Sequence, residues 1–593
     1  MPVDYYARKA VRYDDDILVC AADVETANLG GKLLSVQWGY FGQVKISTSE
    51  NMVQEFFEDF LNMPKPAIWY LHFAQYDWRY FLEYLESANL IVEIGLRTET
   101  DIYEIRCKRD EKDQWSVMRD SYALWSHSLE KLAKSFCPEL PKLEIDIENF
   151  DPSNPDHITY AKRDVEILLV ALPRLFDMIQ THFDVVPSAT AAGTALKAWQ
   201  KSLPKNKIFD CSKWNEKEQF IRQGYYGGLV FLTSNRATES CVTFDRNSSY
   251  PAAMMEFGVP IGNPNYTTDF EENYPGFYRV RIKAPDNLII PIIAARNKKG
   301  AMRWYRGEFE TVVTSQELQF ATKHGYEIVD LYEGFFFETV EFPFTDFIDL
   351  CRIIRKTFPG AAEEQLAKLM QNSLYGKFGS RRDRTRLLHY SQLGDDDIFG
   401  VIPFDEAGKW YVKKELDEEM RCLPQWAAFI TANARLSLLE TAYKVGPENV
   451  LYGDTDSLTI LAGHEKHIDS GSNYGQWKLE KEWEIFRAIA PKVYSGILGK
   501  DILNADGSVK IKKGTFLGAA KGLPKKGIGE KQWRELLENG ETSAETKSLA
   551  SLKIAMKKGV KEAETLTRKS STLKNSMNFD LDEFGNVRVK YAT

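Results

Sequence analysis

The chain carries the sequence YGDTDS at residues 452–457, between two apolar runs at 450–451 and 458–461. Short runs rich in branched residues on either side of Gly and Asp are typical of a β-hairpin with the acids at its turn. Asp454 and Asp456 stand one residue apart, so their carboxylates repel each other unless a cation such as Mg²⁺ lies between them. For this segment alone a solvated turn is the commoner interpretation, because Asp and Gly are ordinary turn residues.

Two further segments supply candidate partners for this hairpin. The sequence FDRNSSYP at residues 244–251 follows an apolar run, so Asp245 is expected to end a strand and enter a turn. The sequence KLMQNSLYG at residues 368–376 lies in a helical pattern. Three of its residues share one face of that helix, because they are spaced i, i+4 and i+7: Lys368, Asn372 and Tyr375.

Together the three segments resemble motifs A, B and C of family B DNA polymerases, in particular the protein-primed branch of phages and mobile elements with linear genomes. YYGG at residues 225–228 resembles the Tyr-x-Gly-Gly linker of that family, and KVY at residues 492–494 resembles its Lys-x-Tyr motif. The resemblance implies a multidomain α/β fold. An RNase H-like 3′–5′ exonuclease domain would precede a right-hand polymerase of palm, fingers and thumb with two insertions.

A second set of acids lies early in the chain. Asp23 and Glu25 follow an apolar strand pattern at 17–22, and alternation in an extended chain points them to one side. A second strand pattern, at 67–71, leads to Tyr76 and Asp77. Tyr160 and Asp164 stand four apart in a helical pattern and so share a face. Each of these acids, taken singly, is more often structural than catalytic.

As a set, the early acids resemble the Exo I, Exo II and Exo III motifs of DEDD-type 3′–5′ exonucleases, in the variant that uses a tyrosine. That chemistry needs four carboxylates to hold two divalent ions. By the same resemblance Tyr160 would orient the attacking water and Lys142 would contact the phosphate being cleaved. A further serine of the family's motif set corresponds to either Ser121 or Ser128.

The Exo II segment departs from the family at one position. Phe73 stands where the family has an Asn that helps to hold single-stranded primer ends. Phe lacks the donor and acceptor of Asn but can stack on a base. The alternative is that Phe73 packs into the exonuclease core beside Tyr70.

The resemblance also assigns roles in the polymerase. Asp245 and Asp456 would hold two Mg²⁺ or Mn²⁺ ions, with Asp454 close by and a contribution from the carbonyl of Arg246. Tyr250 would stack under the incoming sugar, where its ring clashes with a 2′-hydroxyl. Lys356 and Lys368 would neutralise the triphosphate, and Asn372 and Tyr375 complete the nucleotide-binding set. The expected DNA-binding residues are Tyr225, Gly227, Gly228, Phe73, Tyr76, Lys492, Tyr494 and Lys521.

Length and composition set broader limits. At 593 residues the chain is too long for one hydrophobic core, and its 44% hydrophobic and 27% charged residues are typical of a soluble globular protein. The net charge of −9 argues weakly against a nucleic-acid protein, although lysines gather between Lys510 and Lys558, as a DNA-binding patch or a solvated face. Seven scattered cysteines without a Cys-x-x-Cys pair favour a reducing compartment and argue against structural zinc. We expect a monomer in the host cytoplasm that contacts no membrane. The resemblance implies DNA template and primer, dNTPs and a terminal protein as its partners.

The sequence patterns also predict elements and boundaries. Strands are expected at 277–283 and 288–294, a helix at 315–324, fingers helices at 342–358 and 360–378, a hairpin of 398–404 with 409–414, and a helix at 424–443. The predicted domains are an exonuclease at 1–188, palm at 189–262, palm continuation and first insertion at 263–341, fingers at 342–379, second insertion at 380–420, palm at 421–500 and thumb at 501–593.

Two rival functions remain open at this point. One is a polymerase of the same fold that starts chains without a terminal protein. The other is a catalytically dead binding protein descended from a polymerase, which the intact acids of both sets make improbable.

Overall fold

The structure is a computed structural model of the chain. It describes residues 17–27, 31–64, 66–98, 101–145, 150–204, 207, 209, 215–381, 383–393, 401–416, 422–504, 507–523, 528–548, 552, 556, 567–573, 579–581 and 587–589.

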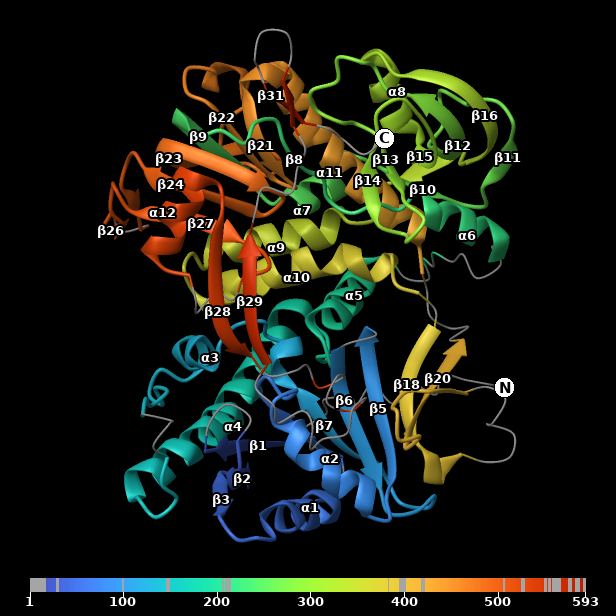
Figure 1. The fold of residues 1–593 in the computed structure, drawn as a ribbon. Coiled ribbons are helices and arrows are strands. Elements are labelled where there is room, and N and C mark those ends of the chain that lie inside the picture. The colour runs from blue at the N-terminus through green and yellow to red at the C-terminus, as the bar shows by residue number, and fades with distance from the viewer. Residues whose placement is uncertain are drawn as a thin grey trace.

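The lower half of Figure 1 is built on one mixed sheet that joins ten strands of the described chain in the order β19-β20-β18-β5-β6-β7-β4-β1-β2-β3. Strands β1, β4 and β7 run parallel, so their carboxyl ends meet at one edge of the sheet. The N-terminal strands are β1 (Leu18–Thr26), β2 (Leu33–Tyr40), β3 (Gln43–Ser47), β4 (Ala67–Leu71), β5 (Ile91–Thr98), β6 (Asp101–Lys108) and β7 (Ser116–Asp120). The helices of this half are α1 (Met52–Asn62), α2 (Trp78–Ser87), α3 (Leu129–Phe136) and α4 (Pro155–Phe183). The strands predicted at 17–22 and 67–71 are thereby confirmed.

Three strands from much later in the chain complete this sheet. They are β18 (Asp383–His389), β19 (Val401–Pro403) and β20 (Trp410–Leu416), and β18 pairs antiparallel with β5. Both Leu387 and Trp410 are fully buried in the N-terminal core, and the Trp410 indole donates to Glu86 at 3.0 Å. The predicted hairpin of the second insertion therefore forms, and it is an extension of the exonuclease-like sheet (Figure 1).

The upper half contains a seven-stranded sheet, counted over the described residues, in the order β27-β24-β23-β9-β22-β21-β8. Its strands are β8 (Val230–Leu232), β9 (Thr238–Arg246), β21 (Val450–Asp454), β22 (Ser457–Leu461), β23 (Trp477–Ala490), β24 (Val493–Leu498) and β27 (Phe516–Ala520). Helix α11 (Pro424–Val445) is buried along almost its whole length, which confirms the helix predicted at 424–443. The short helix α7 (Ser249–Glu256) follows β9 directly.

A separate sheet, which has four strands among the described residues in the order β11-β16-β12-β15, lies beside this one in Figure 1. It contains β11 (Asn265–Thr267), β12 (Gly276–Lys283), β15 (Glu308–Thr314) and β16 (Glu327–Phe336), with α8 (Ser315–Lys323) between the last two. The strand predicted at 288–294 is wrong, because only Ala294 enters a strand, β13 (Ala294–Arg296). Pro291 interrupts the apolar run, because it has no N–H to donate to a neighbouring strand. Two tyrosine hydroxyls take the place of a strand partner for the residues beside it: the Tyr326 hydroxyl accepts from the Ile292 N–H at 3.2 Å, and the Tyr443 hydroxyl donates to the Ile290 carbonyl at 3.0 Å.

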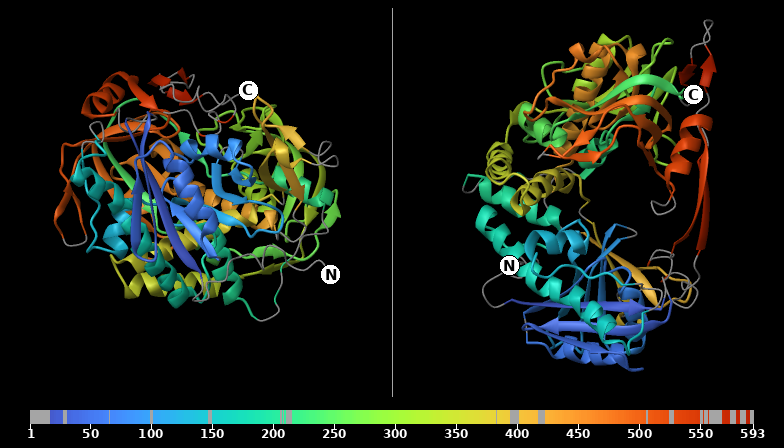
Figure 2. Two further views of the ribbon diagram at one scale, coloured as in Figure 1. Left: turned by 90° about the horizontal axis from the view of Figure 1, so that it is seen from below. Right: turned by 90° about the vertical axis from the view of Figure 1, so that its left-hand side faces the viewer.

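Two antiparallel helices lie between the halves in Figure 1, α9 (Thr345–Thr357) and α10 (Ala362–Phe378). They confirm the predicted helix pair, and the turn between them contains Gly360 with φ 79°. On the opposite side of the molecule, in the right-hand view of Figure 2, β28 (Thr542–Ser548) and β29 (Thr567–Leu573) form a long hairpin that runs from the upper half toward the lower. Leu552 and Met556, which lie in the sequence between β28 and β29, are buried in the hydrophobic core of the lower half.

The structure also shows the state of the cysteines and the character of the helices. The six cysteines in the described ranges are all buried, and none of these six forms a disulfide. Among the described residues, no helix combines the length and apolar character needed to cross a bilayer.

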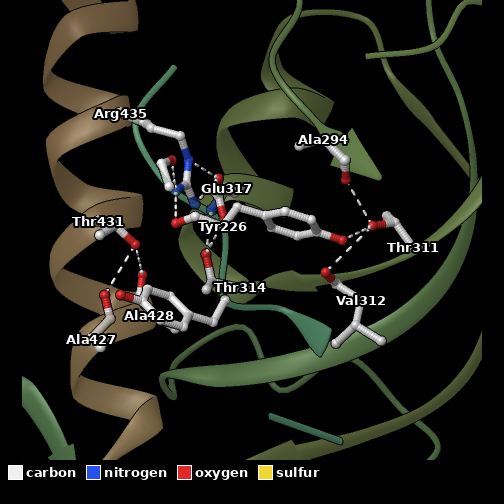
Figure 3. A network of polar contacts seen from close by, with 12 residues as sticks. Tyr226, Ala294, Thr311, Val312, Thr314, Glu317, Ala427, Ala428, Thr431 and Arg435 are labelled. Carbon is white, nitrogen blue, oxygen red and sulfur yellow. Dashed lines mark hydrogen bonds and ion pairs between the residues drawn. The ribbon is translucent and has the colours of Figure 1, made fainter. Parts of the chain in front are cut away.

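A buried ion pair joins the upper elements to one another (Figure 3). Arg435 on α11 donates from Nε and Nη2 to Glu317 Oε1 on α8, at 2.9 and 2.7 Å, and the two side chains are 2% and 3% exposed. The other Glu317 oxygen accepts from the Thr314 hydroxyl at 2.9 Å. Arg435 Nη1 donates to the carbonyls of Tyr226 and Gly227, both at 2.7 Å. One guanidinium therefore holds α8, α11 and the 225–228 linker together.

Replacing Arg435 by Met should destabilise the upper half by about 3–5 kcal/mol, because Glu317 is then left charged and unpaired in the interior. The free energy of unfolding in urea measures the loss. Glu317→Gln added to Arg435→Met should recover part of it by removing the uncompensated charge. An Arg435→Met protein as stable as the parent would contradict the stabilising role of this ion pair.

Candidate active sites

The predicted hairpin forms between β21 and β22, with Asp454 paired to Ser457 across the turn. Strand β22 also pairs with β9, and Ser457 stands opposite Asp245. The backbone N–H of Arg246 donates to the Asp456 carbonyl at 2.7 Å. Sheet register thus brings the acids of residues 244–251 and 452–457 together, although about 200 residues separate them in sequence.

The linker at 225–228 supports the turn from behind. The Thr455 N–H donates to the Leu229 carbonyl at 2.8 Å, and Thr455 has φ 60°, a conformation that is rare for a β-branched residue. A Cβ atom on Gly228 would lie 2.6 Å from Thr455 Oγ1. Glycine at 228 is therefore required by this close approach, which explains why the linker motif ends in glycine.

The three acids of this site differ in their surroundings. Burial, followed by the charges of Asp456 and Glu480, raises the pKa of Asp245 to about 7. Burial also raises the pKa of Asp456, and the neighbouring Asp454 adds to the effect. Asp454 itself accepts from the Tyr452 hydroxyl at 3.2 Å and pairs with Lys492 Nζ at 3.2 Å. Asp245 and Asp456 are thus the two carboxylates that would gain most from a cation.

All three acids line a cavity of about 410 Å³. Its other lining residues include Thr243, Glu480, Lys481, Lys492 and Tyr494. Lys521 lies next to this cavity, because its N–H donates to the Lys492 carbonyl at 2.9 Å. Lys510, Lys512 and Lys513 are exposed, whereas Lys525, Lys526, Lys553, Lys557 and Lys558 lie outside the described residues.

The predicted nucleotide-binding residues lie on three helices, α7, α9 and α10. Lys368 and Asn372 are exposed on α10, and Lys356 is exposed on α9. Lys368 is close enough to Asp245 to lower the pKa of that carboxyl, against the larger effect of burial. The rings of Tyr375 and Tyr250 stack with centroids 4.1 Å apart and an interplanar angle of 17°. Lys368 therefore lies near Asp245, and the two stacked tyrosines lie near enough to Asp456 to feel its charge.

Two predicted residues have additional structural contacts. The Arg246 side chain is buried and donates to the Gly475 carbonyl at 2.9 Å and to Glu256 at 2.7 Å, so only its backbone remains for a ligand. Tyr225 is half-buried against Gly379, where a Cβ atom would lie 2.6 Å from the ring.

The early acids meet at the carboxyl ends of the parallel strands, the usual place for a site on such a sheet. Asp23 and Glu25 lie near the end of β1, and Asp77 accepts from the Val24 N–H at 3.2 Å. Helix α4 adds Tyr160 and Asp164. Lys142 forms an ion pair with Asp164 and lies 5.7 Å from the centre of the Tyr160 ring.

Electrostatic repulsion within this group is strong. Burial, followed by the charge of Asp164, raises the pKa of Asp23 to about 7. Burial, followed by the charge of Asp23, raises the pKa of Glu25 to about 9. Burial is also the largest cause of the raised pKa values of Asp77 and Asp164. Tyr160 is almost fully buried beside these acids, and its own pKa is raised by burial and by their charges.

Both acidic groups fit divalent cations. Within the described ranges no three acidic, histidine or cysteine side chains already enclose a common point. However, one Asp164 oxygen, Oδ1, is buried without a hydrogen-bond donor, and a cation would satisfy it. In the palm, the charge of Asp456 raises the electrostatic cost of ionising Asp245, and a cation between them would lower it. Hard carboxylate oxygens are the ligands that Mg²⁺ and Mn²⁺ prefer.

Phe73 does not pack in the exonuclease core, so that alternative is wrong. Its side chain is 51% exposed, its φ is 61°, and its ring stacks on Tyr122 with centroids 4.0 Å apart. One oxygen of Asp120 accepts from the N–H groups of both Phe73 and Tyr122, at 3.1 and 2.9 Å. The structure thus holds two stacked rings at the edge of the acidic site.

The two candidate serines have different positions. Ser121 is fully buried, donates to the Leu71 carbonyl at 2.9 Å and lies 2.9 Å from His72 Nδ1. Ser128 caps α3 by accepting from the Lys131 N–H at 3.3 Å. Ser121 is therefore the serine beside the loop that carries Phe73, and Tyr76 in the same loop bonds Thr26 at 2.6 Å.

Several residues of these sites were not predicted. Gln37 donates to Asp23 at 2.8 Å, Asp120 positions Phe73 and Tyr122, and Arg435 with Glu317 holds the linker. Arg435 carried one usable signal, because it is the one charged residue in the first two thirds of α11, and a charged residue in such a segment is rarely buried unless it is paired.

The chain resembles known proteins in sequence. The family described as "DNA polymerase type B, organellar and viral" matches residues 152–398. The DNA polymerase of Bacillus phage M2 is 31% identical over 411 residues, which cover 64% of this chain and 67% of that protein. The DNA polymerase of Bacillus phage Nf is 29% identical over 507 residues, covering 77% and 83%. A probable DNA polymerase of Neurospora intermedia is 29% identical over 303 residues, which span 47% of this chain and 31% of that longer protein.

The fold has a counterpart among solved structures. Phi29 DNA polymerase complexed with primer-template DNA and incoming nucleotide substrates superimposes with a TM-score of 0.72 and 21% identity, covering 94% of this chain and all of that one. This likeness confirms the expected fold class, an exonuclease domain followed by palm, fingers and thumb. On these grounds the chain is a DNA-directed DNA polymerase and belongs to the protein-primed family B DNA polymerases.

Proposed function

We propose that this polymerase extends DNA by two-metal chemistry in the palm, corrects its product with a 3′–5′ exonuclease, and starts synthesis on a terminal protein. The observation that carries the first part is the register that sets Asp245 beside the 454–457 turn, with both Asp245 and Asp456 short of a counter-charge. Asp245, Asp456 and the Arg246 carbonyl would hold Mg²⁺ or Mn²⁺. When bound, the two ions would activate the primer 3′-hydroxyl for attack and neutralise the negative charge on the leaving pyrophosphate.

The residues around the palm acids would place the two substrates. Asp454, tied to Tyr452 and Lys492, would assist from one side as an indirect ligand. Lys356 and Lys368 would bind the triphosphate, and Asn372 would complete that face of the helices. The stacked rings of Tyr250 and Tyr375 would support the deoxyribose and leave no room for a 2′-hydroxyl. The primer strand would lie along Tyr225, Gly227, Gly228, Lys492, Tyr494 and Lys521.

The second acidic site supports proofreading. Asp23, Glu25, Asp77 and Asp164 would hold two further ions, Lys142 would contact the scissile phosphate, and Tyr160 would orient water. Phi29 DNA polymerase, which has this fold, has been solved in complex with single-stranded DNA, the substrate that a proofreading site would take.

Protein priming rests on the family and on the two insertions. DNA template, primer, dNTPs and a terminal protein are the partners we propose, and the enzyme would act as a monomer. Incubation with a linear template origin and labelled dATP, with and without a candidate terminal protein, tests this. Label transferred to the protein supports priming on it, whereas synthesis on unprimed template without it would favour the rival that needs no terminal protein.

The two activities should separate by mutation. Asp23→Ala with Glu25→Ala should abolish 3′–5′ degradation and leave primer extension nearly intact, because the sites hold separate ions. Asp456→Asn should do the reverse. Gel assays on one labelled primer measure both. Loss of both activities in either variant would mean that its acids serve folding, and extension by Asp456→Asn would refute the palm assignment.

Phe73 should bind unpaired primer ends by stacking. Phe73→Ala should weaken binding of single-stranded DNA by about 1–3 kcal/mol and slow its degradation, since one base–ring stack is lost. Phe73→Tyr keeps the ring face and should behave as the parent, and extension of a paired primer serves as the internal control. A Phe73→Ala protein that binds and degrades single strands normally would contradict this role.

The raised pKa of Asp245 predicts how stability depends on pH. In metal-free protein the folded state holds a proton on this group more tightly than the unfolded state, so its contribution to stability falls as pH rises from about 4 to 7. Asp245→Asn should therefore raise the thermal midpoint of chelator-treated protein at pH 8 and change it little at pH 4. Added Mg²⁺ should stabilise the parent more than the variant at pH 8. Equal responses of both proteins would contradict a metal at Asp245.

A further inference from the structure

A polar network joins the turn after Asp245 to both fingers helices. The Ser248 hydroxyl accepts from Arg355 Nη1 on α9 at 2.9 Å and from Gln371 Nε2 on α10 at 3.4 Å. The Tyr474 hydroxyl accepts from the same Arg355 nitrogen at 2.9 Å and donates to Gln371 Oε1 at 2.8 Å. Ser248, Arg355, Gln371 and Tyr474 therefore form a closed ring of four hydrogen bonds, called the latch below.

The latch is held from the palm side. Ser248 has φ 49° and ψ 52°, a left-handed backbone that a residue other than glycine keeps only when its surroundings impose it. The loop that carries Tyr474 is bonded to the neighbouring Asn247: the Gly475 N–H donates to the Asn247 carbonyl, and the Asn247 N–H donates to the Gln476 carbonyl, both at 2.9 Å. Gln371 is fully buried, so its amide depends on these partners.

Three latch residues neighbour, in sequence, residues proposed to bind the nucleotide. Arg355 precedes the exposed Lys356, and the buried Gln371 precedes the exposed Asn372. Ser248 lies two residues before Tyr250, whose ring stacks on Tyr375. Three of the four latch residues, Ser248, Arg355 and Gln371, are thus adjacent in sequence, or nearly so, to residues proposed to bind the nucleotide, and Tyr474 joins them through its hydrogen bonds.

We propose that the latch fixes the two fingers helices on the turn after Asp245 and so determines the affinity for the incoming deoxynucleoside triphosphate. Binding a flexible triphosphate is tighter when its ligands are already ordered, because less conformational entropy is lost. The four are positioning residues, since they act through Lys356, Lys368 and Asn372. The inference rests on the nucleotide site proposed above.

Single-nucleotide insertion on a primed template tests the latch. Tyr474→Phe removes one hydroxyl and keeps the ring, and Gln371→Met removes the amide at similar volume. Each should raise KM for dNTP about five- to tenfold, the effect of losing one or two buried hydrogen bonds, with kcat within about twofold. The double variant should be no worse than the more affected single, because both changes open the same ring. Tyr443→Phe, which removes a tyrosine hydrogen bond elsewhere in the upper half, is the matched control and should leave KM unchanged.

The outcomes separate the latch from the site it serves. Unchanged KM in both single variants, additive effects in the double variant, or a fall in kcat at constant KM would each overturn the latch. Lys368→Ala in the same assay tests the nucleotide site itself, and an unchanged KM there would overturn the site instead. Thermal midpoints within a few degrees of the parent show that the comparison concerns folded protein.

Discussion

The buried ion pair of Arg435 and Glu317 is the interaction on which the polymerase half depends. A guanidinium in the interior must use its donors, and here they bind a carboxylate on α8 and two carbonyls of the linker. Gly228 of the linker packs closely against Thr455, and this contact holds the turn between Asp454 and Asp456 in place. The positions of Asp454 and Asp456 thus depend on a series of contacts that begins at one charged pair in the core.

The two acidic sites balance their charge in different ways. In the lower half Lys142 pairs with Asp164, yet Asp23 and Glu25 still bear the repulsion of their neighbours. In the palm Lys492 forms an ion pair with Asp454, whereas Asp245 and Asp456 form no such ion pair among the described residues. A net charge of −9 for the whole chain conveys little of this, because the electrostatics that matter for chemistry act over a few ångströms.

Local patterns in the sequence were sufficient for the hairpin at 450–461 and for α10 and α11, because each depends on short-range periodicity or turn chemistry. The acids were grouped into two sites by the resemblance to known motifs and not by local pattern. Contacts between distant segments were not predictable. Arg435 and Glu317 are 118 residues apart, and the pairing of β18 with β5 follows no local signal. The false strand at 288–294 has the same origin, since two tyrosines from elsewhere in the chain bond its backbone. Phe73 was identified as unusual from its position, but its exposure and its stacking on Tyr122 required the tertiary structure.

The shared sheet of the lower half has a consequence for how this enzyme can be divided. Strands β18 and β20 belong in sequence to the polymerase half but lie in a sheet whose remaining strands, apart from the neighbouring β19, come from the first 120 residues. A fragment that began after α4 would carry β18 with one side unpaired and with Leu387 and Trp410 uncovered, and such an edge promotes aggregation. Residues 1–188 expressed alone would lose the same pairing partner from β5. The exonuclease and polymerase regions are therefore distinct in chemistry but interdependent in folding, and evolution could exchange one of them only by also supplying the strands that the other contributes.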